Sequence, residues 1–129
     1  MSRTGIAIAL AVVLVVAGRV PARALEAAQA EAVDRLVAST ASKKTAVAAM
    51  AAHYAVLLWV EDYCDGRSDE SVRAYIMSKT VADPDAFEAG WAEASELLNK
   101  AERAAMCELA LAQYGPEGAL IKGAWSPRR

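Results

Sequence analysis

The stretch from Thr45 to Cys64 (TAVAAMAAHYAVLLWVEDYC) constrains the fold more than any other part of the chain. Residues 46–60 include no charged side chain, and a helix over this run would be roughly 22 Å long. Such a helix is too apolar to lie on a surface and too short to cross a bilayer comfortably. The stretch therefore predicts the central helix of a small bundle, with one of the two cysteines at its end.

The first 24 residues have the pattern of a secretory signal peptide. Residues 6–17 form an unbroken apolar run, which is shorter than the roughly 20 residues that a spanning helix needs. Residues 22–24 (ARA) fit the small-x-small cleavage site, so we expect cleavage before Leu25 and a periplasmic or secreted protein. Arg19 and Arg23 leave open the alternative of an uncleaved segment that anchors the chain in a membrane.

The charge balance argues against two classes of partner. Without residues 1–24, which contain three arginines and no acid, the chain has 11 basic and 16 acidic residues and a formal charge of −5. A mildly acidic surface disfavours nucleic acid and charge-driven binding to anionic lipids.

The two cysteines, Cys64 and Cys107, predict a disulfide, because an exported chain meets an oxidising compartment and two cysteines allow one pairing. In the chain-entropy model, closing the loop between Cys64 and Cys107 stabilises the folded chain by roughly 4 kcal/mol. The alternative, a redox-active or metal-binding cysteine pair, lacks the close C-x-x-C spacing of such sites.

Apolar spacing predicts an amphipathic helix over about 25–40. The polar segment 39–44 (STASKK) then interrupts the apolar stripe, so we expect a second, separate helix over 45–64. The two lysines of this polar segment suit the last turn of the first helix better than the positively polarised start of the second helix. One continuous helix over 25–64 is the alternative.

Capping residues set the remaining helices. Gly66 is expected to end the central helix in a left-handed conformation, and Ser68 to cap a short helix over 69–79. Asp83-Pro84 is the clearest helix start in the chain and predicts a helix over 84–114. Asn99, with Glu102 three residues on, could cap a new helix, so a break there is left open.

The sequence therefore predicts an all-α protein with one disulfide. The helical domain covers 25–114, as a bundle of three to four helices, and the glycine- and proline-rich segment 115–129 is an irregular tail. We find no strand-like alternation. Trp125 in this tail either packs on the bundle or serves as an anchor for a partner.

Two features could carry chemistry. Five acidic residues follow the central helix and could form a weak cation site, a partner surface or a solvated turn: Glu61, Asp62, Asp65, Asp69 and Glu70. The turn does not match a calcium-binding loop, since Val72 occupies the place of the bidentate glutamate. His53, the single histidine, lies in the most apolar helix, either as a hydrogen-bonded core residue or as a pH sensor.

No catalytic, metal-ligating or cofactor-binding motif is present in the sequence, so we expect neither an enzyme nor a cofactor. The leading hypothesis is a small exported protein that binds or protects another exported protein, with a homodimer left open. An enzyme or cation-binding protein centred on residues 61–70 is the alternative from another class.

A more specific hypothesis is an acid-responsive periplasmic chaperone, in which protonation of the carboxylates loosens a bundle that the disulfide keeps compact. In size, helix content and single disulfide the chain resembles the HdeA type of acid chaperone, and the resemblance implies this activity. That family has a cysteine between a tryptophan and a Glu-Asp pair. Here the order is Trp59, Glu61, Asp62, Cys64, so the resemblance covers the architecture alone.

Overall fold

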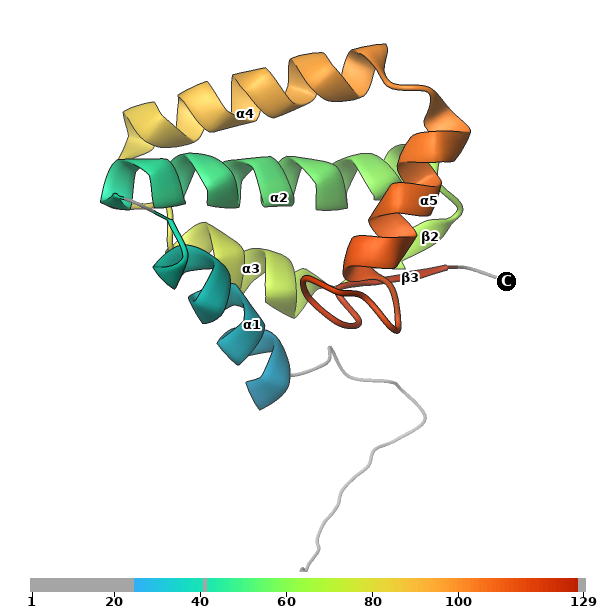
Figure 1. Cartoon of the computed structure of the whole chain (residues 1–129), viewed down its shortest axis with the longest axis horizontal. Coiled ribbons are helices and arrows are strands. Elements are labelled where there is room, and N and C mark those ends of the chain that lie inside the picture. Colours follow the sequence, from blue (N-terminus) through green and yellow to red (C-terminus); the bar gives the residue numbers. More distant parts are fainter. Residues whose placement is uncertain (1–24, 41, 128–129) are drawn as a thin grey trace, which may run out of the picture.

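The computed structural model of the protein describes residues 25–40 and 42–127, and the predicted signal segment lies outside these ranges (Figure 1). Five helices are described: α1 (Ala27–Ala38), α2 (Lys43–Tyr63), α3 (Glu70–Ser78), α4 (Pro84–Lys100) and α5 (Arg103–Tyr114). The prediction of a small all-α fold is confirmed, with five helices in place of three to four. Among the described residues, no helix combines the length and the apolar character needed to cross a membrane.

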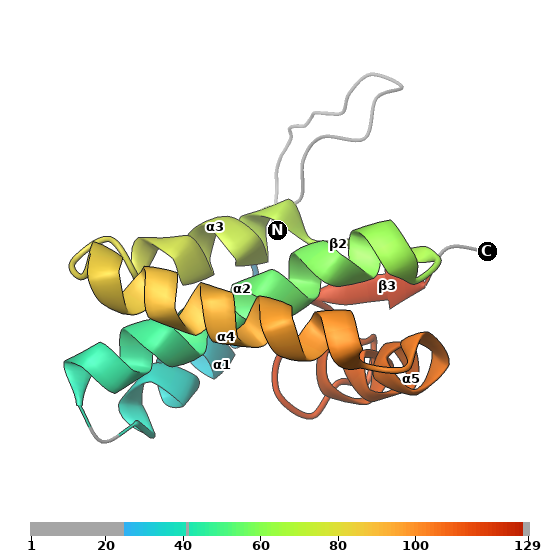
Figure 2. The same ribbon diagram turned by 90° about the horizontal axis from the view of Figure 1, so that it is seen from above.

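Helix α2 is the centre of the arrangement (Figures 1 and 2). Helix α4 lies along one side of α2 and runs in the same direction, whereas α3 runs back along another side. Helix α1 lies against the first half of α2, and α5 crosses steeply near its end. Several elements thus cover α2, which explains why its sequence is apolar on most faces.

The described part of the molecule contains two apolar cores that share α2. The main core joins α1, α2, α3, α5 and the tail, and its fully buried side chains include Val33, Leu57, Ile76 and Ile121. The smaller core lies between α2 and α4 and includes Ala55, Ala94 and Leu98, with Trp59, Trp91 and Met106 packed against it.

Helices α1 and α2 are separate, as expected. The side chain of Ser42 accepts a hydrogen bond from the backbone N–H of Thr45 and so caps α2. The helix therefore begins at Lys43, and the lysines of the polar segment lie in its first turn. Their expected place in the preceding helix was wrong because the serine cap fixes the start of α2.

The predicted helix over 84–114 is two helices. Asp83 caps α4 through the N–H of Ala86, with Pro84 in the first turn, as predicted. Helix α4 ends at Lys100, and the carboxylate of Glu102 accepts hydrogen bonds from the N–H groups of Ala104 and Ala105. Glu102 is therefore itself the N-cap of α5, and the chain changes direction there.

The tail 115–129 was predicted to be irregular, and its described part is non-helical but includes a short strand. Strand β3 (Trp125–Pro127) pairs antiparallel with β2 (Gly66–Ser68), placing Gly66 opposite Pro127 and Ser68 opposite Trp125. The described ranges contain no long strand, in line with the absence of strand-like alternation in the sequence. Three residues are too few to produce a visible alternation in the sequence.

Gly66 and Ser68 have roles other than the predicted caps. Helix α2 ends at Tyr63, and Gly66 lies in β2, where a β-carbon would overlap the indole ring of Trp125. The glycine is needed for this close approach and not for a left-handed cap. Asp69 is the N-cap of α3, while the hydroxyl of Ser68 donates to Glu61.

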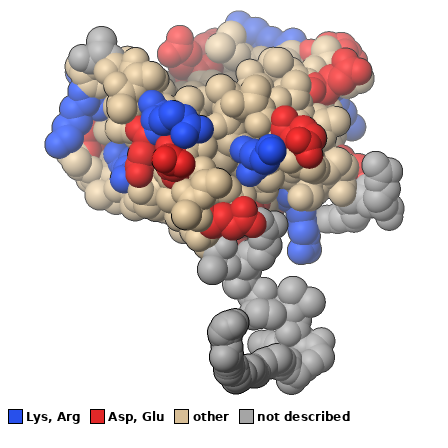
Figure 3. Space-filling model, turned by 60° about the horizontal axis from the view of Figure 1, so that its bottom comes forward, with Lys and Arg blue, Asp and Glu red and all other residues tan. Residues whose placement is uncertain are grey.

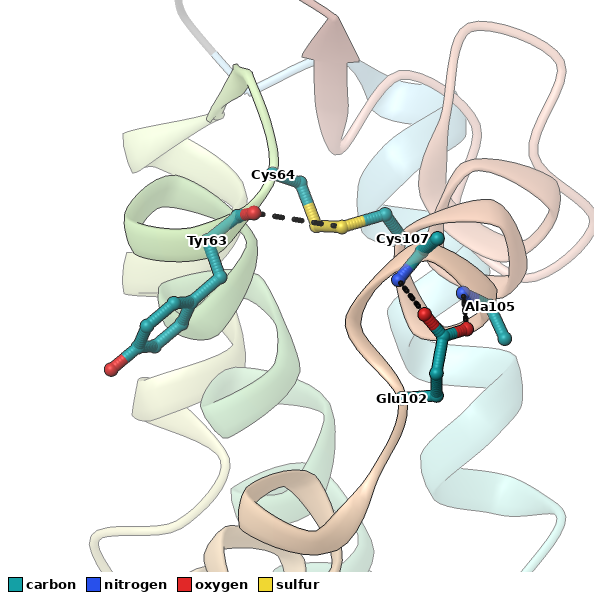
Figure 4. Close-up of a disulfide and its surroundings, with 6 residues drawn as sticks. Tyr63, Cys64, Glu102, Ala105 and Cys107 are labelled. Carbon is teal, nitrogen blue, oxygen red and sulfur yellow. Dashed lines mark hydrogen bonds between the residues drawn. A yellow bond between two sulfur atoms is a disulfide. The ribbon is translucent and has the colours of Figure 1, made fainter.

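The predicted disulfide between Cys64 and Cys107 is confirmed, with a Cα–Cα distance of 5.7 Å (Figure 4). It joins the end of α2 to the first half of α5, close to the Glu102 cap. Helix α5 buries few side chains, namely Ala110 and Tyr114. The disulfide is therefore a principal attachment of α5 to the bundle.

We predict that replacing both cysteines, Cys64→Ser with Cys107→Ser, lowers the free energy of unfolding by up to about 4 kcal/mol, because the unfolded chain regains the freedom that the closed loop removes. Urea unfolding of the oxidised wild type and of the double variant measures this difference. The reduced wild type is the control and should unfold with the variant. Coincident curves for all three proteins would contradict the prediction.

Candidate functional site

The strongest candidate site is an apolar groove of about 580 Å³ between α2 and α4, closed at one end by the start of α5. We call it the α2–α4 groove. From α2 its lining includes Ala48, Ala52 and Val56. It follows the open side of the smaller core, with which it shares several residues. Its volume is within the range of sites that bind ligands in a concave, mostly apolar surface.

Small residues allow the two helices to approach closely under the groove. Gly90 of α4 lies against the backbone of Ala48, so closely that a β-carbon at Gly90 would overlap it. Ala94 on α4 and Ala101, just past the end of α4, continue this row of small residues along the floor of the groove. The floor of the groove is therefore low, and larger side chains form its edges.

Leu97 and Leu98 show how α4 contributes to the groove. Both residues line it, but Leu98 is buried in the smaller core whereas Leu97 is 65% exposed. Met106 of α5 closes the groove at the end where the chain turns. An exposed leucine on the edge of an apolar groove is a surface that favours burial against a partner.

Two polar residues are part of the lining, Thr45 at one end and Glu93 on the α4 side. Glu93 is the one charged residue of the lining, and no described residue forms an ion pair or hydrogen bond with it. The arrangement can hold an apolar group next to a single negative charge.

The predicted acidic cluster is not brought together around one point. Glu61 accepts hydrogen bonds from the N–H and hydroxyl of Ser68 and lies 3.7 Å from Arg73. Partial burial opposes ionisation of Glu61, but these hydrogen bonds and the nearby arginine outweigh it and lower its pKa. Asp69 serves as a helix cap, and Asp65 is exposed in the turn.

Within the described ranges, no three histidine, cysteine or acidic side chains are arranged to hold a metal ion. The remaining cluster residues, Asp62 and Glu70, are exposed. Elsewhere on the surface, the face in Figure 3 carries basic and acidic side chains next to one another. Among the described residues, Asp34 and Lys79 form an ion pair at 3.2 Å.

His53 is partly buried and lies 2.5 Å from the hydroxyl of Tyr114 through its Nδ1 atom. The tyrosine is 2% exposed, and its burial raises the pKa of the hydroxyl. Burial also lowers the pKa of His53 below its usual 6.5. The pair joins α2 to the end of α5, so His53 has the environment of a hydrogen-bonded core residue that resists protonation.

Trp125 is 4% exposed and packs in the main core. Its ring lies against Gly66, which is the tail-to-bundle packing that the sequence allowed as one of two arrangements. The other arrangement, an exposed anchor for a partner, does not fit this burial.

The groove itself was not predicted from the sequence. The signals for it were the run of alanines at 48, 49 and 52, and the Leu97-Leu98 pair. Helical spacing alone does not tell which of two adjacent leucines faces solvent when the helix has neighbours on more than one side.

We predict that the stability of the protein falls as the pH decreases below about 6.5, in part through His53. Below this pH the His53 side chain of the unfolded chain binds a proton, whereas the buried imidazole of the folded chain resists protonation because its pKa is lowered. Because one proton is involved, the free energy of unfolding changes through His53 by at most about 1.4 kcal/mol per pH unit.

The variant His53→Gln tests this, because it removes the titration and keeps a polar group beside Tyr114. Urea unfolding at several pH values between about 7 and 5 should give a free energy of unfolding that depends less on pH for the variant than for the wild type. Since His53 is the single histidine of the chain, the change in slope is assigned to it. Parallel slopes for the two proteins would show that His53 titrates normally.

A comparison of the chain with protein-family models, with curated proteins and with solved structures found no match to any of them.

Proposed function

We propose that the protein is a non-enzymatic binding protein that holds an apolar segment of another exported protein in the α2–α4 groove. The observation that carries the proposal is Leu97, which is 65% exposed on the edge of an apolar groove. Burying it against a partner removes apolar surface from water, which is the main favourable contribution to protein association.

Localisation is part of the same proposal. A disulfide between Cys64 and Cys107 is compatible with an oxidising compartment, where such bonds form and persist. The signal-like pattern of residues 1–24 supports the same placement. We propose a periplasmic or secreted protein whose partner shares that compartment.

The proposal predicts contact between position 97 and a partner in the exporting cell. A photoreactive benzoylphenylalanine placed at position 97 should give a covalent adduct with another exported protein on irradiation, because the side chain lies in the interface. Position 81 is the matched control, since Val81 is 73% exposed and outside the groove. Mass spectrometry of the adducts identifies what was bound.

Equal adducts from the two positions would contradict groove binding. Adducts from position 97 with lipid alone would assign the groove to another class of ligand. An adduct with a second copy of the chain would point to the homodimer.

An acid-responsive chaperone is a second candidate, and the attachment of α5 favours it. Helix α5 buries Ala110 and Tyr114, and the hydrogen-bond partner of Tyr114 is His53, whose protonation is unfavourable while it is buried. In acid, loss of this contact and protonation of the carboxylates would loosen α5, while the disulfide keeps it tethered.

This second candidate predicts that an apolar dye binds the oxidised protein strongly below about pH 3 and weakly at neutral pH. The acidified protein should also suppress aggregation of a client protein under the same conditions. Dye fluorescence and light scattering measure the two effects. The absence of dye binding at low pH would eliminate the chaperone and leave groove binding unaffected.

A further inference from the structure

The charge around the α2–α4 groove points to the chemistry of its partner. Glu93 lines the groove without a partner among the described residues. Lys100, the one basic residue of α4, lies 3.7 Å from Glu96. The carboxylate beside the apolar surface therefore forms no ion pair within the described part of the chain.

The rest of α4 strengthens this negative field. The helix contains four acidic residues and one basic residue. The described ranges as a whole contain all 16 acidic residues of the chain and nine basic ones, since the other five arginines lie in 1–24 and 128–129. An acidic partner would meet repulsion here, and a basic partner would be attracted and oriented.

The shape of the groove favours a helix over an extended chain. An extended peptide is usually held by backbone hydrogen bonds at a sheet edge, whereas the backbone groups of α2 and α4 are bonded within their own helices. A helix instead presents apolar side chains at three- and four-residue steps to a trough between helices. The low floor formed by Ala52, Gly90 and Ala94 leaves room for such side chains.

We propose that the partner segment is a basic amphipathic helix. Its apolar face packs on the floor of the groove and on Leu97, and a lysine or arginine of its polar face pairs with Glu93. This inference rests on the proposed function, because it names the partner of the same groove. A second copy of this chain fits less well, since it would bring another acidic α4 to the interface.

Two model peptides of about 16 residues, close to the length of α4, test the inference. They share one apolar leucine and alanine face and differ in a polar face made of lysine or of glutamate. Fluorescence anisotropy at low and moderate salt gives their dissociation constants. We expect the wild type to bind the lysine peptide roughly tenfold or more tightly than the glutamate peptide, with a smaller ratio at higher salt.

Three variants test whether the preference for the lysine peptide comes from Glu93 and the groove. Glu93→Lys should reverse or abolish the preference, because it inverts the charge beside the apolar floor. Glu88→Lys is the matched control, since it inverts an exposed charge of the same helix outside the groove lining and should alter the ratio much less. Leu97→Asn should weaken both peptides, because it removes apolar contact without adding a charge, and its exposed position allows the variant to fold.

The outcomes separate the inference from the function on which it rests. Equal binding of the two peptides, or a preference unchanged by Glu93→Lys, would overturn the basic partner. If Leu97→Asn still weakened both peptides, groove binding would stand in either case. Binding of neither peptide to the wild type would overturn the inference and count against groove binding itself.

Discussion

Burial of α2 from more than one side is the constraint on which the rest of the structure depends. One side of the helix packs into the main core through residues such as Met50 and Leu57, and another packs on α4 through Ala55. A helix enclosed in this way has no room for charge along its middle, as its sequence shows. The strip that α4 and α5 leave uncovered is apolar for the same reason, and it forms the groove.

The parts of the fold that were predictable are those for which one local signal had no competitor. A run without charge from residue 46 to 60 can hardly be other than a core helix, and Asp83-Pro84 combines a cap with a fixed backbone angle. The disulfide followed because Cys64 had one possible partner. Each of these signals acts within a few residues or by elimination, so no knowledge of the packing was needed.

The parts that were missed depend on contacts between residues distant in sequence. Gly66 resembled a helix cap, but its role is set by Trp125, which packs against it from the far end of the chain. The spacing of Asn99 and Glu102 favours a cap at Asn99, whereas the side chain of Glu102 itself caps α5. The groove depends on which of Leu97 and Leu98 faces α2, and this follows from how α4 lies on its neighbours.

The place of Trp125 determines when the molecule can be completed during synthesis. This residue follows the five described helices, yet it fills the main core and covers Gly66 of the β2 strand. A nascent chain can form its helices early from local contacts, but it cannot close its core until the segment that carries Trp125 has emerged. Throughout elongation the unfinished bundle therefore exposes apolar surface to the factors that capture or degrade incomplete chains.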